Sequence, residues 1–253
     1  MLKKLFAYDM KNLSKLLVGT CVTLIGSGAL ACLLFYVSML LPDKFTFIPM
    51  LPYAILMLCI LTGGPLMTLY IFIYYYRSFY TDTGYLTFVF PATMKEHLNA
   101  KLLSGILFSL AIALSTVIGA LIALIPNLGA SWLLLLFNGV SSTTNVLMIL
   151  LYAVLILTSL ISQVFLVYLA ITLGSLFFSK HKVLGSVIFY FVVNWGVSLV
   201  EGILSVIVIA LIASLPEIAS MIASVLLSLV CAVGVLIASY IINLRMLERR
   251  LNL

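Results

Sequence analysis

The chain has 253 residues, of which 65% are hydrophobic and 8% are charged, and its formal net charge is +6. Soluble domains carry about 25% charged residues, so this composition excludes an ordinary soluble protein. The basic residues stand at the ends of apolar stretches and form no patch, which indicates anionic lipid headgroups, and not nucleic acid, as their partners. All four cysteines lie inside apolar stretches without metal or disulfide spacing, so we expect no metal site.

Residues 1–15 show a helical pattern of their own. The lysines occupy one face and the other face is apolar, made up of Leu2, Leu5, Phe6, Met10, Leu13 and Leu17. This spacing predicts a basic amphipathic helix that lies in the cytoplasmic membrane interface before the chain turns into the first span. The alternative is a straight cytoplasmic extension of that span.

Six apolar segments are long enough to cross a bilayer, since about 20 residues cross roughly 30 Å of hydrocarbon. They lie near residues 16–41, 50–75, 102–125, 146–173, 183–200 and 218–242. We therefore predict an all-α membrane protein in which residues 1–253 form a single transmembrane domain of six helices.

The basic residues predict the orientation of this domain. Of the 13 lysines and arginines, only Lys44 lies in a connection on the outer side. The others share the opposite side: Lys3, Lys4, Lys11, Lys15, Arg77, Lys95, Lys101, Lys180, Lys182, Arg245, Arg249 and Arg250. Short basic loops remain in the cytoplasm, so both termini are predicted to be cytoplasmic, in a bacterial cytoplasmic membrane.

The fifth apolar segment is longer than one span. From Val183 to Leu215 it would measure about 50 Å as a helix. We expect Glu201-Gly202 to break it, because a charge followed by glycine is unfavourable in a buried helix, and 203–215 to form a re-entrant outer segment.

Glu201 is the one acidic residue embedded in an apolar run, and Asn194 shares its helix face. Acidic residues at membrane depth are often functional, so Asn194 and Glu201 are candidates for a substrate pathway. Alternatively, Glu201 only ends the fifth span at the outer surface. Gln163 in the fourth span is expected to form an interhelical hydrogen bond.

The longest cytoplasmic connection, residues 77–101, contains a helix-start signal. Thr93-x-x-Glu96 is a capping box, in which the two side chains satisfy exposed amides of the first turn. It predicts a helix that begins near Met94 and runs through Lys101 into the third span. The aromatic-rich stretch before it is either a docking surface for a soluble partner or a loop packed on its own helix ends.

This connection also carries a family resemblance. The resembling runs are Gly84-Tyr85-Leu86-Thr87-Phe88, Phe90-Pro91-Ala92-Thr93, Glu96-His97-Leu98 and Lys101-Leu102-Leu103-Ser104. They resemble the stretch after the second span in permease subunits of bacterial ABC-2 type transporters, above all those of Firmicutes that handle antimicrobial or toxic peptides. The whole chain shares that family's layout, which includes an N-terminal interfacial helix and a re-entrant segment between the fifth and sixth spans.

The resemblance implies an exporter subunit that moves amphipathic peptides or other amphipathic cargo out of the cell. It implies a second permease copy, in a homodimer or a heterodimer, and a separate cytoplasmic ATPase. The coupling role toward that ATPase falls on Phe90, Pro91, Thr93, Lys95, Glu96, His97 and Lys101. The chain has no G-x-x-x-x-G-K-[ST] motif, so ATP and Mg are expected on the partner and no cofactor on this chain.

Two other functions fit the composition less well. A substrate-binding membrane subunit of a vitamin importer also has about six spans and an external ATPase, but such subunits are usually shorter. An intramembrane enzyme needs clustered ligands or paired glutamates. The histidines, His97 and His181, both fall in predicted cytoplasmic connections and no Glu-Glu pair occurs, so we predict no catalytic residues.

Overall fold

The computed structural model describes residues 2–40, 51–81, 92–128, 143–178, 180–212 and 216–251. These residues form the helices α1 (Leu2–Leu40), α2 (Leu51–Tyr80), α4 (Met94–Leu128), α6 (Thr143–Phe177), α7 (Lys182–Ile212) and α8 (Glu217–Leu251). The described part of the chain contains no strand. The prediction of an all-α protein is therefore confirmed.

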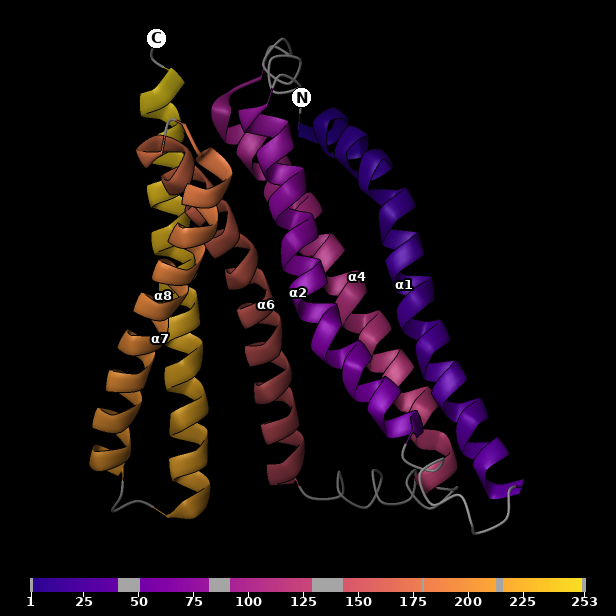
Figure 1. The fold of residues 1–253 in the computed structure, drawn as a ribbon. Helices are drawn as coiled ribbons and strands as arrows, with labels where there is room; N and C mark the ends of the chain where they lie inside the picture. Colours follow the sequence, from indigo (N-terminus) through magenta and orange to yellow (C-terminus); the bar gives the residue numbers. More distant parts are fainter. Residues whose placement is uncertain are drawn as a thin grey trace.

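The helices form two groups that run alternately up and down along one axis (Figure 1). α1, α2 and α4 pack together, as do α6, α7 and α8, and α6 also contacts α2 and α4. Both termini lie at the same end of the molecule (Figure 1). The basic segments of α1, α2, α4, α7 and α8 all lie toward that end, because each helix starts or finishes there.

Five helices are long and apolar enough, over their described residues, to cross a bilayer. The qualifying stretches are Leu2–Val37, Met94–Ile125, Val146–Phe177, Lys182–Val208 and Ala219–Glu248. Helices suit this environment because every internal backbone group is bonded within the segment, whereas hydrocarbon offers no water to bond unpaired groups. The chain therefore has the architecture of a multi-pass membrane protein.

The core lies between α2, α4 and α6 and combines aliphatic with aromatic side chains. Tyr75 of α2 stacks on Tyr168 of α6 with ring centroids 3.9 Å apart and an interplanar angle of 12°. Phe108 of α4 and Ile171 of α6 are fully buried in the same cluster. Away from this cluster many large apolar side chains face outward, as expected for a surface in contact with lipid.

α1 and α4 approach each other through small residues. A side-chain carbon added at Gly28 would overlap the backbone oxygen of Gly119, and one added at Gly119 would lie 2.7 Å from the backbone oxygen of Leu24. Glycines at such a crossing let two helix backbones come closer than larger side chains permit. These glycines therefore allow α1 to pack closely against α4.

The N-terminal helix is not separated from the first span. α1 is one uninterrupted helix of 39 residues, and its first turns lean away from the axis of the rest (Figure 1). The predicted amphipathic pattern is present, since all four lysines of residues 2–15 are exposed and Leu13 is buried. The turn that we predicted between this helix and the span does not occur.

The predicted break at Glu201-Gly202 is wrong. α7 continues through both residues to Ile212, so 203–212 extend the fifth helix instead of turning back. Glycine weakens a helix by only about 1 kcal/mol relative to alanine, whereas unsatisfied backbone groups in hydrocarbon cost several kcal/mol each. The Glu201 side chain is exposed, so the helix carries the charge on its surface without breaking.

Candidate functional site

The capped start of α4 is present as predicted. The Thr93 backbone amide donates to Glu96 Oε2 at 3.0 Å, and the Glu96 backbone amide lies 3.4 Å from Thr93 Oγ1. The helix begins at Met94 and continues through Lys101 to Leu128. The two predicted coupling residues Phe90 and Pro91 lie outside the described residues.

The other predicted coupling residues divide into an outer and an inner set. Thr93 and Lys95 are exposed and Glu96 is partly buried. His97 is only 3% exposed and Lys101 only 5% exposed. The first turn of α4 therefore offers a surface to a partner, while the next turn points into the molecule.

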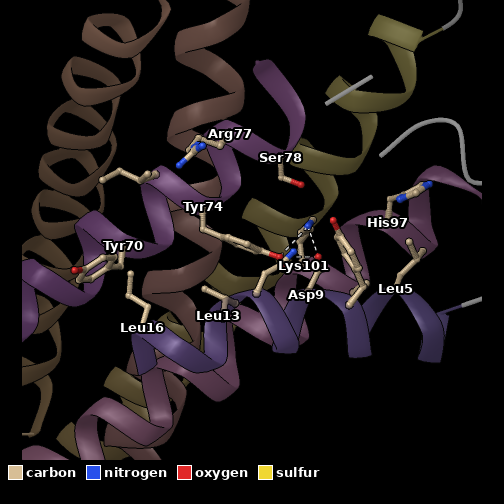
Figure 2. A pocket seen from close by; sticks show the side chains of 14 residues that line it. Leu5, Asp9, Leu13, Leu16, Tyr70, Tyr74, Arg77, Ser78, His97 and Lys101 are labelled. Carbon is tan, nitrogen blue, oxygen red and sulfur yellow. Dashed lines mark hydrogen bonds and ion pairs between the residues drawn. The ribbon is translucent and has the colours of Figure 1, made fainter. Parts of the chain in front are cut away.

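Lys101 is held by a buried polar cluster with Asp9 and Tyr74, which the sequence analysis did not identify. The Lys101 ammonium forms an ion pair with Asp9 Oδ1 at 2.5 Å. It also donates to the Tyr74 hydroxyl at 3.2 Å, and that hydroxyl donates to Asp9 Oδ1 at 2.6 Å. Figure 2 shows the three side chains meeting from α1, α2 and α4. We call them the Asp9–Tyr74–Lys101 cluster.

A fourth helix joins the cluster through the backbone. The Tyr168 hydroxyl of α6 donates to the backbone oxygen of Lys101 at 2.9 Å. The Lys101 ammonium also lies 4.6 Å from the centre of the Tyr74 ring, a distance typical of a cation–π contact. The second turn of α4 is thus fixed to α1, α2 and α6 at a single residue.

A cavity of about 580 Å³ opens beside this cluster, between α1, α2 and α4. Leu5, Leu13 and Leu16 of α1 form part of its apolar wall, and Arg77 and His97 add polar groups (Figure 2). Asn12 also lines it. Its lining residues come from the early turns of α1 and α4 and the late turns of α2, which lie at the end of the molecule where both termini are found (Figure 1). Both partners of the ion pair, Asp9 and Lys101, line it.

The predicted pathway residues lie in the other helix group. Asn194 and Glu201 of α7 line one groove of about 240 Å³ together with residues of α6 and α8. The expectation that the two share a face is confirmed. Gln163 lines the same groove and makes no hydrogen bond with any described residue, so its predicted interhelical bond is absent.

The position of Asp9 in the sequence already indicated that its side chain is buried, and the sequence analysis did not use it. It lies four residues after Leu5 and four before Leu13, on the apolar face of the first helix. Residues four apart share a helix face, so the carboxylate had to be buried with them and required a cationic partner. The identity of that partner, 92 positions away, does not follow from local spacing.

Within the described residues, no three histidine, cysteine, aspartate or glutamate side chains are placed to hold a metal ion. No protein-family model, curated protein or solved structure matches the chain.

Proposed function

We propose that this chain is the permease subunit of an ATP-driven exporter of the ABC-2 type, which crosses the bacterial cytoplasmic membrane six times and has both termini in the cytoplasm. In this proposal two permease copies bind two copies of a separate ATPase, which holds ATP and Mg. The cargo is an amphipathic peptide or a similar amphiphile.

The observation that carries this proposal is the division of the α4 start into an exposed and an anchored turn. Thr93 and Lys95 are exposed in the first turn, while Lys101 is bonded to side chains of α1 and α2 and, through its backbone, to α6. A soluble partner that pushes on the first turn would thereby move four helices together. A rigid link of this kind suits a subunit that receives work from an ATPase.

The distribution of charge supports the same orientation. Basic residues are concentrated at the end of the molecule that carries both termini and the capped turn. Positively charged segments are retained on the cytoplasmic side, where a soluble ATPase is available.

The test is co-expression with soluble ABC ATPases of the same genome, followed by capture and measurement of ATP hydrolysis. Lys95→Glu should weaken ATPase capture at least about tenfold, because it reverses an exposed charge on the docking turn. Lys180→Glu is the matched control, since Lys180 is an exposed lysine at the same end of the molecule but outside α4. Equal capture of the ATPase by both variants, or no capture by the parent chain, contradicts the proposal.

Counting the copies in the captured complex separates the exporter from the vitamin-importer alternative. An exporter of this type should contain two copies of the chain per complex. Native mass spectrometry that finds one copy of this chain and no second permease favours the importer subunit.

A further inference from the structure

The groove between α6, α7 and α8 is lined by both polar and aliphatic side chains. α7 supplies Asn194, Ser198, Glu201 and Ser205, which follow one another at steps of four, three and four residues and so form one stripe. The α6 and α8 walls are mixed. Ser159, Ser162, Gln163 and Ser228 are polar, and the aliphatic part consists of Leu155, Leu166, Leu227, Ala232 and Val235. A single polar stripe in an otherwise apolar helix marks the face that meets something other than lipid.

The stripe reaches from the middle of the membrane toward its far surface. Along α7, Asn194 lies about 18 Å and Glu201 about 28 Å from Lys182 at the basic end of the molecule. The hydrocarbon core is about 30 Å thick. Under the proposed orientation the groove therefore faces the outer leaflet.

Most polar groups of the groove are satisfied locally, but the carboxylate is not. Asn194 donates to the backbone oxygen of Tyr190 at 3.1 Å, and Ser205 donates to that of Gly202 at 2.7 Å. Glu201 has no hydrogen bond or ion pair with any residue in the described ranges. Gln163, across the groove on α6, likewise has none.

The groove lining contains no lysine, arginine or histidine among the described residues that could neutralise Glu201. A carboxylate near the outer edge of the hydrocarbon is stabilised by pairing with a cation. The volume of about 240 Å³ is enough for one ammonium or guanidinium group and part of an aliphatic stem. The aliphatic side chains Leu155, Leu166 and Leu227 suit such a stem, and the Gln163 amide oxygen provides a second acceptor for the cationic head.

We propose that this groove binds the positively charged head of a cationic amphiphile, such as the ammonium or guanidinium group of a lysine or arginine in an amphipathic peptide. Glu201 forms the ion pair, and the aliphatic side chains of the lining contact the stem. The identification of this occupant as cargo rests on the proposed exporter function. Binding itself does not, and the test therefore uses the isolated chain without any ATPase.

Cys231 of α8 lines the same groove and provides a natural reporter. The experiment uses the full chain in neutral detergent, with this cysteine retained and the remaining ones replaced: Cys21→Ala, Cys32→Ala and Cys59→Ala. Modification rates of Cys231 are measured with a cationic and with an anionic methanethiosulfonate reagent of similar size. The ratio of the two rates, divided by the ratio for a free thiol, reports the sign of the local potential.

A carboxylate in the same groove as the thiol should raise this normalised ratio by about tenfold, and Glu201→Gln should return it to about one. Glu248→Gln is the matched control, because Glu248 is an exposed glutamate of α8 outside the groove, and it should leave the ratio unchanged. An unchanged ratio in Glu201→Gln overturns the proposal. Failure of both reagents to reach Cys231 overturns it as well, because the groove is then closed to charged groups.

The second arm measures protection of Cys231 from an uncharged maleimide. Decylammonium should slow modification about tenfold in the parent chain and have little effect in Glu201→Gln, because the variant lacks the charge that holds the head group. Equal protection of Cys231 by decyl sulfate would show that any alkyl chain fills the apolar part of the groove. Protection of Cys231 by sodium chloride at the same ionic strength would show that the groove binds only an inorganic cation. Either result overturns the proposal, whereas failed ATPase capture with intact protection would contradict only the exporter function.

Discussion

Asp9 and Lys101 are buried together, at 3% and 5% exposure, in a protein whose surface is largely apolar. Removing two charges from water is costly, and their mutual attraction offsets this only when further hydrogen bonds complete the geometry. Tyr74 supplies these bonds, since its hydroxyl accepts from the ammonium and donates to the carboxylate. Each member of the cluster therefore depends on the other two.

Replacing one charged member should destabilise the fold strongly. Lys101→Met or Asp9→Leu leaves an unpaired buried charge, and we expect each to lower the free energy of unfolding by about 3–5 kcal/mol. The triple variant Asp9→Leu, Tyr74→Phe and Lys101→Met should recover most of this loss, because it leaves no member of the cluster unpaired. Denaturant unfolding in detergent measures it.

The control for this series is Lys95→Met, which removes an exposed lysine from the same helix. It should change the free energy of unfolding by less than about 0.5 kcal/mol. Single variants at Asp9 and Lys101 that are as stable as the parent would show that the pair does not hold α1 to α4.

At the scale of the helices, the crossing of α1 and α4 depends on the absence of a side chain at Gly28. Gly28→Ala would place a methyl group against the backbone of Gly119, which a neighbouring side chain cannot relieve by rotating. We expect a loss of about 1–3 kcal/mol in the free energy of unfolding, measured in detergent.

Gly26 offers a matched comparison on the same helix. Nothing lies within 4 Å of a side-chain carbon placed there, so Gly26→Ala should be neutral or raise the free energy of unfolding by about 0.5–1 kcal/mol. Equal effects at the two glycines would mean that α1 and α4 do not approach closely.

The capping box at the start of α4 should stabilise the first turn of this helix only. Thr93→Ala removes the hydroxyl near the Glu96 amide and should weaken the first turn by about 0.5–2 kcal/mol without unfolding the protein. Hydrogen exchange of the amides in 94–97 should accelerate about tenfold, while exchange in the middle of α4 stays constant. Uniform acceleration along α4 would instead indicate global destabilisation.

The helices differ in how well local patterns predicted them. The Thr93–Glu96 signal located the start of α4 because a capping box acts within one turn. The break at Glu201-Gly202 was wrong because we weighed residue propensity and not the backbone bonds that a break would expose in hydrocarbon. A span boundary in such a chain depends on its surroundings more than on its weakest residues.

For the whole molecule, the orientation in the membrane can be tested directly. In a cysteine-free background, Lys95→Cys should react with a membrane-impermeant maleimide only after the cells are opened, because the proposed orientation places the basic end in the cytoplasm. A cysteine introduced at Lys44, on the predicted outer side, should react in intact cells. Labelling of position 95 from outside would reverse the proposed orientation.

At this scale the all-helical architecture could be predicted from hydropathy, since apolar segments of sufficient length have few alternatives in a bilayer. Which helices pack against each other could not be predicted in this way. The Asp9–Lys101 pair and the Tyr75–Tyr168 stack join helices far apart in the chain, and neither hydropathy nor helical periodicity specifies which helices become neighbours. The groove residues Asn194 and Glu201 were found because both lie on one helix.

The unbroken α7 has a consequence for the lipids around the protein. Its 31 residues span about 46 Å and carry only Glu201 as a charge beyond Lys182, whereas an average hydrocarbon core is about 30 Å thick. Such hydrophobic mismatch is relieved by helix tilt or by local thickening of the bilayer. In vesicles of phosphatidylcholine with increasing acyl-chain length, thermal stability should therefore rise from about 14 to about 20 carbons. A maximum at the shortest chains would mean that much of α7 lies outside the hydrocarbon.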